Sequence, residues 1–195
     1  MKNRLLRVGL ILACLGLASC GWRSIPQSKN EVEAKLAEVT NQYKRRSDLI
    51  PNLVNVVKGY AAHEKETLTG VVEARAKATK VEMKPGDLTP AKMKQFQAAQ
   101  GQLSSALSRL MVVVEKYPNL KADQNFRDLQ RQLEGTENRI TVARNRYIET
   151  IKQFNNLVTV PPTSWTNSVM YNFEKMPQWT VEDVKAIEDA PKVEM

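Results

Sequence analysis

The segment His63-Glu64-Lys65-Glu66-Thr67 comes close to the HExxH signature of helical zinc proteases. That signature needs a second histidine one helical turn after the first, so that both imidazoles face one metal ion. Thr67 stands at that position, and His63 is the only histidine in the chain. The spacing therefore predicts no zinc site. It indicates a polar helix face on which His63 is solvated or hydrogen-bonded.

Other catalytic arrangements are also missing from the sequence. Glu64 and Glu66 are two residues apart, so a helix points their carboxylates in different directions. The Ser104-Ser105 pair has no neighbouring histidine, and no glycine-rich phosphate loop occurs. One histidine and two cysteines cannot build a Cys/His zinc site, a disulfide framework or a bis-histidine haem site. We therefore expect no catalytic residues, no metal and no cofactor, and a protein that is not an enzyme.

Basic side chains are the remaining candidates for a binding site. They form two clusters: Lys44, Arg45 and Arg46 in the first, and Arg139, Arg144 and Arg146 in the second. Arg46 falls in an apolar repeat, as do Glu64 and Thr136, and a buried polar side chain requires hydrogen-bonded partners. These groups form either an anion or partner site, or a polar layer that sets helix register. We favour the polar layer, because polar residues at such positions are known for that role.

Three long segments must position these side chains. In each, apolar residues alternate spacings of three and four, which averages 3.5 residues and is typical of packed helices. The pattern predicts helices near 28–80, 89–117 and 121–158, separated by the turn at 84–87 and by Pro118-Asn119. Short connections favour antiparallel neighbours. We therefore predict an all-α fold, a long antiparallel three-helix bundle over 28–160, with helix one kinked near Pro51. The alternative at Pro51 is a break of helix one into two helices.

The lengths of these helices leave one apolar surface without a partner. At about 1.5 Å per residue, helix one spans nearly 80 Å and helix two roughly 43 Å. The residues before Pro51 would then protrude as a stalk. Its apolar stripe, called the stalk stripe below, consists of Val32, Leu36, Val39 and Tyr43. We expect this stripe to pair with a second copy or a partner protein, or else to receive the C-terminal tail.

The irregular tail at 161–195 contains four aromatic residues between 165 and 179. So many aromatic side chains in a short run argue for docking onto the bundle. Residues 180–189 could add one short helix with Thr180 as its N-cap.

The N-terminus reads as a targeting segment. Lys2, Arg4 and Arg7 precede an apolar run at 8–17, and the run is shorter than the roughly 20 residues that cross a bilayer. Small residues before Cys20 are similar to a bacterial lipobox, in which the cysteine is acylated with fatty acids such as palmitate. We therefore expect a lipoprotein signal peptide at 1–19 and a lipidated linker at 20–27. An uncleaved membrane anchor is the alternative.

The excess of basic over acidic side chains is consistent with an exported protein at a membrane surface. The formal net charge of the whole chain is +8, and the signal peptide carries +3 of it, so the mature chain would keep +5. This charge would draw it towards anionic headgroups or cell-wall polymers. We expect it to be extracytoplasmic, lipid-anchored at the cell membrane or the outer membrane, and not to bind nucleic acid.

Several longer stretches resemble one protein family. They are QYKRRSDLIPNLV at 42–54, VKGYAAHEKETL at 57–68, EARA at 73–76, LSSAL at 103–107, YPNLKA at 117–122 and LEGTENRI at 133–140. Together they are similar to the LemA family of bacterial membrane-anchored proteins. The resemblance covers about residues 30–158. It implies an N-terminally anchored, extracytoplasmic helical bundle whose biochemical role is not established, with no cofactor and no catalytic residues to carry over.

These observations lead to two functional hypotheses. The first is a lipid-anchored scaffold or adaptor of the cell envelope that binds another protein through its bundle. The alternative is an envelope enzyme, or an enzyme subunit, that acts on cell-wall polymers. A pocket that pairs Glu64 or Glu66 with Arg139 or Arg146 would favour the alternative.

Overall fold

The computed structural model describes residues 22–84, 86 and 88–179. Over these ranges the chain is helical and contains no β-strand, which confirms the all-α prediction. The elements are α2 (Ser24–Tyr60), α3 (Lys65–Lys80), α4 (Pro90–Val114), α5 (Pro118–Ala122), α6 (Gln124–Thr159), α7 (Thr163–Thr166) and the π-helical turn η2 (Asn167–Tyr171). The targeting segment at 1–19, Cys20 and the expected short helix at 180–189 lie outside the described residues.

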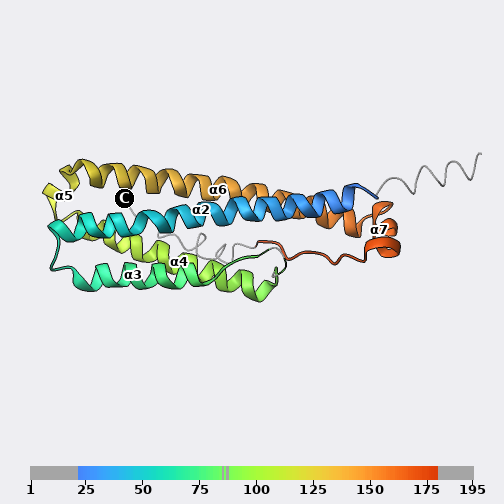
Figure 1. Cartoon of the computed structure of the whole chain (residues 1–195), viewed down its shortest axis with the longest axis horizontal. Coiled ribbons are helices and arrows are strands. Elements are labelled where there is room, and N and C mark those ends of the chain that lie inside the picture. The colour runs from blue at the N-terminus through green and yellow to red at the C-terminus, as the bar shows by residue number, and fades with distance from the viewer. Residues whose placement is uncertain (1–21, 85, 87, 180–195) are drawn as a thin grey trace, which may run out of the picture.

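The helices α2 and α6 form the long axis of the molecule (Figure 1). They have 37 and 36 residues, so each spans about 55 Å. The shorter helices α3 and α4 pack together as a hairpin beside them, and the chain runs in alternating directions through α2, α3, α4 and α6. The α2–α3 turn and α5 lie at one end, here called the α5 end. The opposite end, called the α7 end, holds the start of α2, the end of α6, α7 and η2.

The helix predicted over 28–80 is interrupted, but the interruption lies about ten residues after Pro51. The helix continues through Pro51 to Tyr60, and residues 61–64 form the turn into α3. This turn is held by backbone hydrogen bonds, including one from the Glu64 N–H to the Ala61 carbonyl at 3.1 Å. The structure therefore has four main helices, and the predicted three-helix bundle with one helix over 28–80 is wrong. Because the chain reverses direction at this turn, Leu68 and Val71 of α3 are buried in the same core as Val57 of α2.

Proline is tolerated inside α2 because another helix replaces the missing donor. Pro51 has no N–H, so the carbonyl of Ser47 loses its intrahelical hydrogen bond. The Arg75 side chain on α3 donates from Nε to that carbonyl at 2.8 Å. The carbonyl is thus satisfied without a break in the helix.

The core consists of two apolar clusters along the bundle. The first lies between all four main helices towards the α5 end and includes Leu53, Leu103 and Phe126. The second lies towards the α7 end, where α2 and α6 meet the start of α4, Met83 and Trp179. The two long helices contribute to both clusters, so they connect the two halves of the core.

The stalk stripe belongs to the second cluster, and its expected exposure is wrong. Val32 and Val39 are completely buried, Leu36 is 1% exposed and Tyr43 is 7% exposed. The chain covers the stripe itself, because α6 is as long as α2 and lies along its whole length. The stripe is therefore not available to pair with a second copy or a partner protein.

The described part of the tail docks on the bundle, as the sequence predicted. The Asn155 side chain on α6 donates to the Met176 carbonyl at 3.0 Å and accepts from the Met176 N–H at 2.8 Å. Trp179 is 6% exposed and packs edge-on against Phe96 and Tyr147. The tail thus covers part of the core at the α7 end and adds to the burial of the stalk stripe.

None of the helices in the described ranges has the length and apolar character that crossing a bilayer requires.

Candidate functional site

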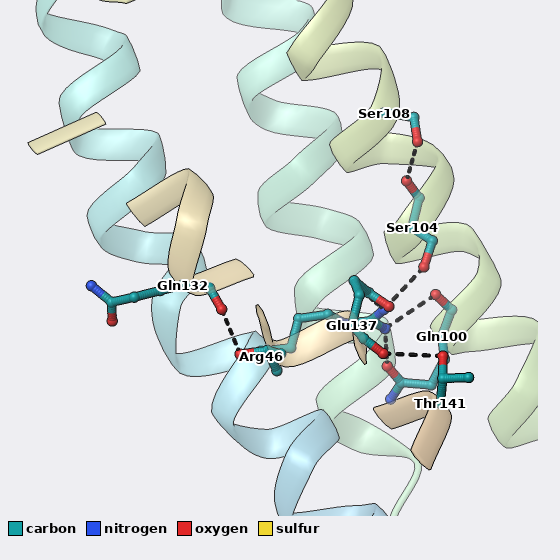
Figure 2. Close-up of polar contacts among 8 residues, drawn as sticks. Arg46, Gln100, Ser104, Ser108, Gln132, Glu137 and Thr141 are labelled. Carbon is teal, nitrogen blue, oxygen red and sulfur yellow. Dashed lines mark hydrogen bonds and ion pairs between the residues drawn. The ribbon is translucent and has the colours of Figure 1, made fainter. Parts of the chain in front are cut away.

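A buried arginine joins three helices at the middle of the bundle (Figure 2). Arg46 on α2 is 1% exposed, and its Nη1 donates to Glu137 Oε1 on α6 at 2.6 Å. The same nitrogen donates to Ser104 Oγ on α4 at 3.0 Å. Its Nη2 donates to Gln100 Oε1 at 2.6 Å and to the Gln100 carbonyl at 3.4 Å. One guanidinium group therefore binds both α4 and α6.

The fourth helix joins this network through backbone carbonyls. Gln100 donates from Nε2 to the Ala78 carbonyl on α3 at 3.4 Å, and Arg75 on α3 contacts the Ser47 carbonyl on α2. Arg46 also lies over the Tyr43 ring, with its guanidinium carbon 5.1 Å from the ring centroid. These bonds require one relative register of the four helices, which is the geometry expected of a polar layer.

The predicted basic clusters do not come together as one patch. Arg46 points into the bundle, whereas Lys44 and Arg45 are exposed. On α6, Arg139 donates to the hydroxyl of the buried Thr136 at 3.1 Å, and Arg146 forms a 2.9 Å ion pair with Glu38. Arg144 is half-buried and lies close to Arg46 along the wall of a pocket.

This pocket has a volume of about 410 Å³ and lies between α2, α4, α6 and the tail. Its charged lining consists of Arg46, Arg144 and Lys94, with Glu137 as the acidic group. Trp179 and Tyr43 contribute aromatic surface. We name it the Arg144 pocket. Its lining combines more positive than negative charge with apolar contact area, which suits a carboxylate carried on a peptide.

Burial and neighbouring positive charges shift the pKa of the Tyr43 phenol in opposite directions. Burial raises the pKa of the Tyr43 phenol, and the neighbouring Arg144 and Arg46 charges oppose that rise. Burial also raises the pKa of Tyr147, whose hydroxyl is buried and has no hydrogen-bond partner in the described chain. Both phenols therefore stay neutral over the physiological pH range.

Several of these residues were not singled out from the sequence. Gln100 carried a signal, because it is a polar residue within an apolar repeat, as Arg46 is. Ser104 was considered only as a possible nucleophile, and Glu137 carried no signal, since each lies next to the apolar repeat of its helix. Whether Arg46 can donate to Ser104 and Glu137 depends on which faces of α4 and α6 pack against α2.

The acidic candidates lie elsewhere in the fold. Glu64 accepts a hydrogen bond from the Tyr117 hydroxyl at 3.1 Å at the α5 end. Glu66 lines a surface depression of about 570 Å³ together with Lys65, Glu73 and Arg109. Neither glutamate shares a described pocket with Arg139 or Arg146. In the described residues, no group of three or more potential metal-ligating side chains comes together.

The geometry defines a class of protein: an elongated, all-helical bundle with a buried arginine network and a docked C-terminal tail. Comparison with known proteins then gives the family. The model of the LemA family matches residues 35–195, so the chain belongs to the LemA family. It is also 24% identical over 143 residues to the Protein LemA of Metamycoplasma hominis, an alignment that covers 73% of this chain. The chain spans 60% of the length of that relative.

Proposed function

We propose that this protein is a lipid-anchored scaffold or adaptor of the bacterial cell envelope. Its bundle would hold a partner protein outside the cytoplasm, with acylated Cys20 as the attachment to the cell membrane or outer membrane. Membership of the LemA family supports a bundle protein of the envelope. The proposal makes the chain a binding protein without cofactor, metal or nucleic acid, and not an enzyme of cell-wall polymers.

The Arg144 pocket is the observation that carries this proposal. The Arg46 guanidinium already binds Glu137, Ser104 and Gln100, so it serves the bundle itself. Arg144 lines the same pocket from α6 and interacts with the Tyr43 phenol, yet it stays half-exposed, so we infer that its guanidinium can also bind an incoming carboxylate. The adjacent Trp179 indole provides a rigid apolar wall. An acidic peptide segment of a partner protein fits this combination of cation and aromatic surface.

A charge reversal in the pocket tests this proposal. Full-length, tagged Arg144→Glu protein is compared with the wild type by cross-linking in membranes and quantitative mass spectrometry of captured proteins. Arg139→Glu is the matched control, because Arg139 is exposed on the same helix and outside the pocket. We expect Arg144→Glu to lose one specific partner that wild type and Arg139→Glu retain.

A common set of captured proteins in all three samples would overturn the pocket as the partner site. Circular dichroism and chemical denaturation of each variant exclude unfolding as the cause of a loss. A second variant, Arg144→Gln, removes the charge without introducing repulsion and should give the same loss to a smaller extent.

A further inference from the structure

Exposed apolar side chains gather at the α7 end of the bundle. Of the nine most exposed large apolar residues in the described chain, five belong to segments that meet there. They are Trp22 (58% exposed), Val160 (52%), Trp165 (65%), Val169 (85%) and Met170 (45%). We call this set the terminal apolar surface. Its two tryptophans are costly to leave in water, which indicates an interaction surface.

Specific hydrogen bonds build this surface. The Tyr171 hydroxyl donates to the Trp22 carbonyl at 2.6 Å and so ties η2 to the residues before α2. The Asn167 side chain donates to the Phe173 carbonyl at 2.9 Å and accepts from its N–H at 3.0 Å. Asn167 is 6% exposed and also donates to the Val158 carbonyl of α6 at 3.4 Å. The exposed side chains are therefore carried on an ordered support.

The charge pattern separates this end from the rest of the molecule. Charged residues make up 26% of the chain, yet the 153–173 segment contains no Asp, Glu, Lys or Arg. Residues 22–30 contain Arg23 and Lys29 and no acidic residue. At the α5 end, by contrast, the segment 115–131 is rich in charge of both signs: Glu115, Lys116, Lys121, Asp123, Arg127, Asp128 and Arg131. The α7 end therefore combines apolar exposure with segments that contain no acidic group, unlike the α5 end.

We propose that the terminal apolar surface binds the lipid bilayer directly. Tryptophan is enriched at the level of lipid headgroups, where its ring is half in apolar and half in polar surroundings. Arg23 lies beside Trp22, and a basic side chain at this position suits anionic headgroups. Trp22 follows the apolar run at 8–17 and the candidate acylation site Cys20 within a few residues. Either form of attachment therefore brings the α7 end to the membrane surface.

This inference deepens the proposed function, since it depends on membrane attachment but not on the partner. It assigns an orientation, in which the α5 end is distal and the long helices project from the bilayer. Arg46 lies 22 residues along α2 from Ser24, which corresponds to about 33 Å. The Arg144 pocket would then be presented well above the headgroups, at a height suited to a partner in the envelope.

Tryptophan fluorescence tests the orientation in the full, membrane-attached chain. The protein is purified from membranes and reconstituted into vesicles of phosphatidylethanolamine and phosphatidylglycerol, with or without brominated acyl chains. Trp22→Phe leaves Trp165 as the exposed indole of the described residues, while the backbone carbonyl at position 22 is retained. We expect brominated lipid to cause a loss of Trp165 emission, and the vesicles to shield this indole from acrylamide in water.

The matched control places an exposed indole near the α5 end. Val112 lies near the end of α4 and is 68% exposed, so Val112→Trp is introduced with Trp22→Phe and Trp165→Phe. This indole should be quenched by acrylamide and not by brominated lipid. The orientation is wrong if the indole at position 165 responds in the same way as the indole at position 112.

A second pair of variants separates direct lipid contact from mere proximity. Val169→Asp places a charge on the terminal apolar surface, whereas Val112→Asp places one near the α5 end, and both sites are exposed. We expect only Val169→Asp to reduce lipid quenching of Trp165. Unchanged quenching in both variants would overturn the direct contact. None of these measurements depends on the Arg144 pocket, so failure here is distinct from failure of the adaptor proposal.

Discussion

Arg75 on α3 donates its Nε–H to the Ser47 carbonyl on α2 at 2.8 Å, and this is the carbonyl that Pro51 leaves without a helical donor. Ser47 is 2% exposed, so water has little access to that carbonyl. The contact therefore satisfies a buried acceptor and also links α2 to α3.

Arg75→Met should destabilise the protein, because the Ser47 carbonyl then stays buried without a partner. The expected loss of unfolding free energy is about 1–3 kcal/mol. Chemical denaturation measures it, with Pro51→Ala as the matched background, since alanine restores the intrahelical N–H donor. In that background Arg75→Met should cost clearly less. Equal costs in both backgrounds would show that the arginine acts in some other way.

The two partners of the central ion pair should respond unequally to removal. The Arg46 side chain is 2% exposed and the Glu137 side chain 48%. Loss of Glu137 therefore leaves a buried charge without its counter-ion, although Ser104 and Gln100 still accept from it, whereas loss of Arg46 leaves a charge that water can reach. We expect Glu137→Leu to cost about 3–5 kcal/mol. We expect Arg46→Met to cost about 1–3 kcal/mol, because the glutamate turns to water. Urea denaturation at neutral pH compares them, and the reverse order would contradict this explanation.

The tail tryptophan should matter far more for stability than its exposed counterpart. Trp179 is buried against Phe96 and Tyr147, so Trp179→Ala should leave a cavity and cost about 3–5 kcal/mol. The same change at the 65% exposed Trp165 should stay within about 0.5 kcal/mol. Thermal and chemical denaturation measure both variants. Similar losses at the two positions would mean that the tail does not contribute to the core in solution.

Stability at acidic pH should depend on Asp123, the N-cap of α6. Its carboxylate accepts from the Phe126 N–H at 2.9 Å and from the Tyr60 hydroxyl at 2.9 Å. These bonds hold the pKa of Asp123 below its ordinary value of 3.8. The folded pKa is the lower one, so this stabilisation is present above the unfolded pKa and is lost as the pH falls through the folded pKa. In acid titrations followed by circular dichroism, Asp123→Asn should show a shallower loss of stability over that range than the wild type.

Cys20→Ala should block lipidation of the protein. Without the thiol there is no site for an acyl chain, so labelling with a palmitate analogue and the lipid mass increment should both be lost. A protein that keeps its mass and still fractionates with membranes would identify the apolar run at 8–17 as the anchor. Cys14→Ala serves as the control and should leave labelling unchanged.

The sequence by itself determined the helical character of this protein. An apolar spacing that averages 3.5 residues is a local property, and it located α4 and α6 to within a few residues, although it joined α2 and α3 into one helix. The aromatic tail was predicted to dock, and Trp179 does so. The polar residue within the first apolar stripe, Arg46, was correctly expected to need hydrogen-bonded partners.

The tertiary structure decided where the first helix ends and which surfaces meet. The α2–α3 turn at residues 61–64 contains no proline. Pro51 does not end α2, because Arg75 of α3 donates to the Ser47 carbonyl that the proline leaves without a partner. The stalk stripe is buried against α6. Arg46 binds Glu137, which lies 91 positions further along the sequence. Helix periodicity specifies which face of each helix is apolar. The choice of partner depends on how all the faces pack at once, so only the assembled bundle determined it.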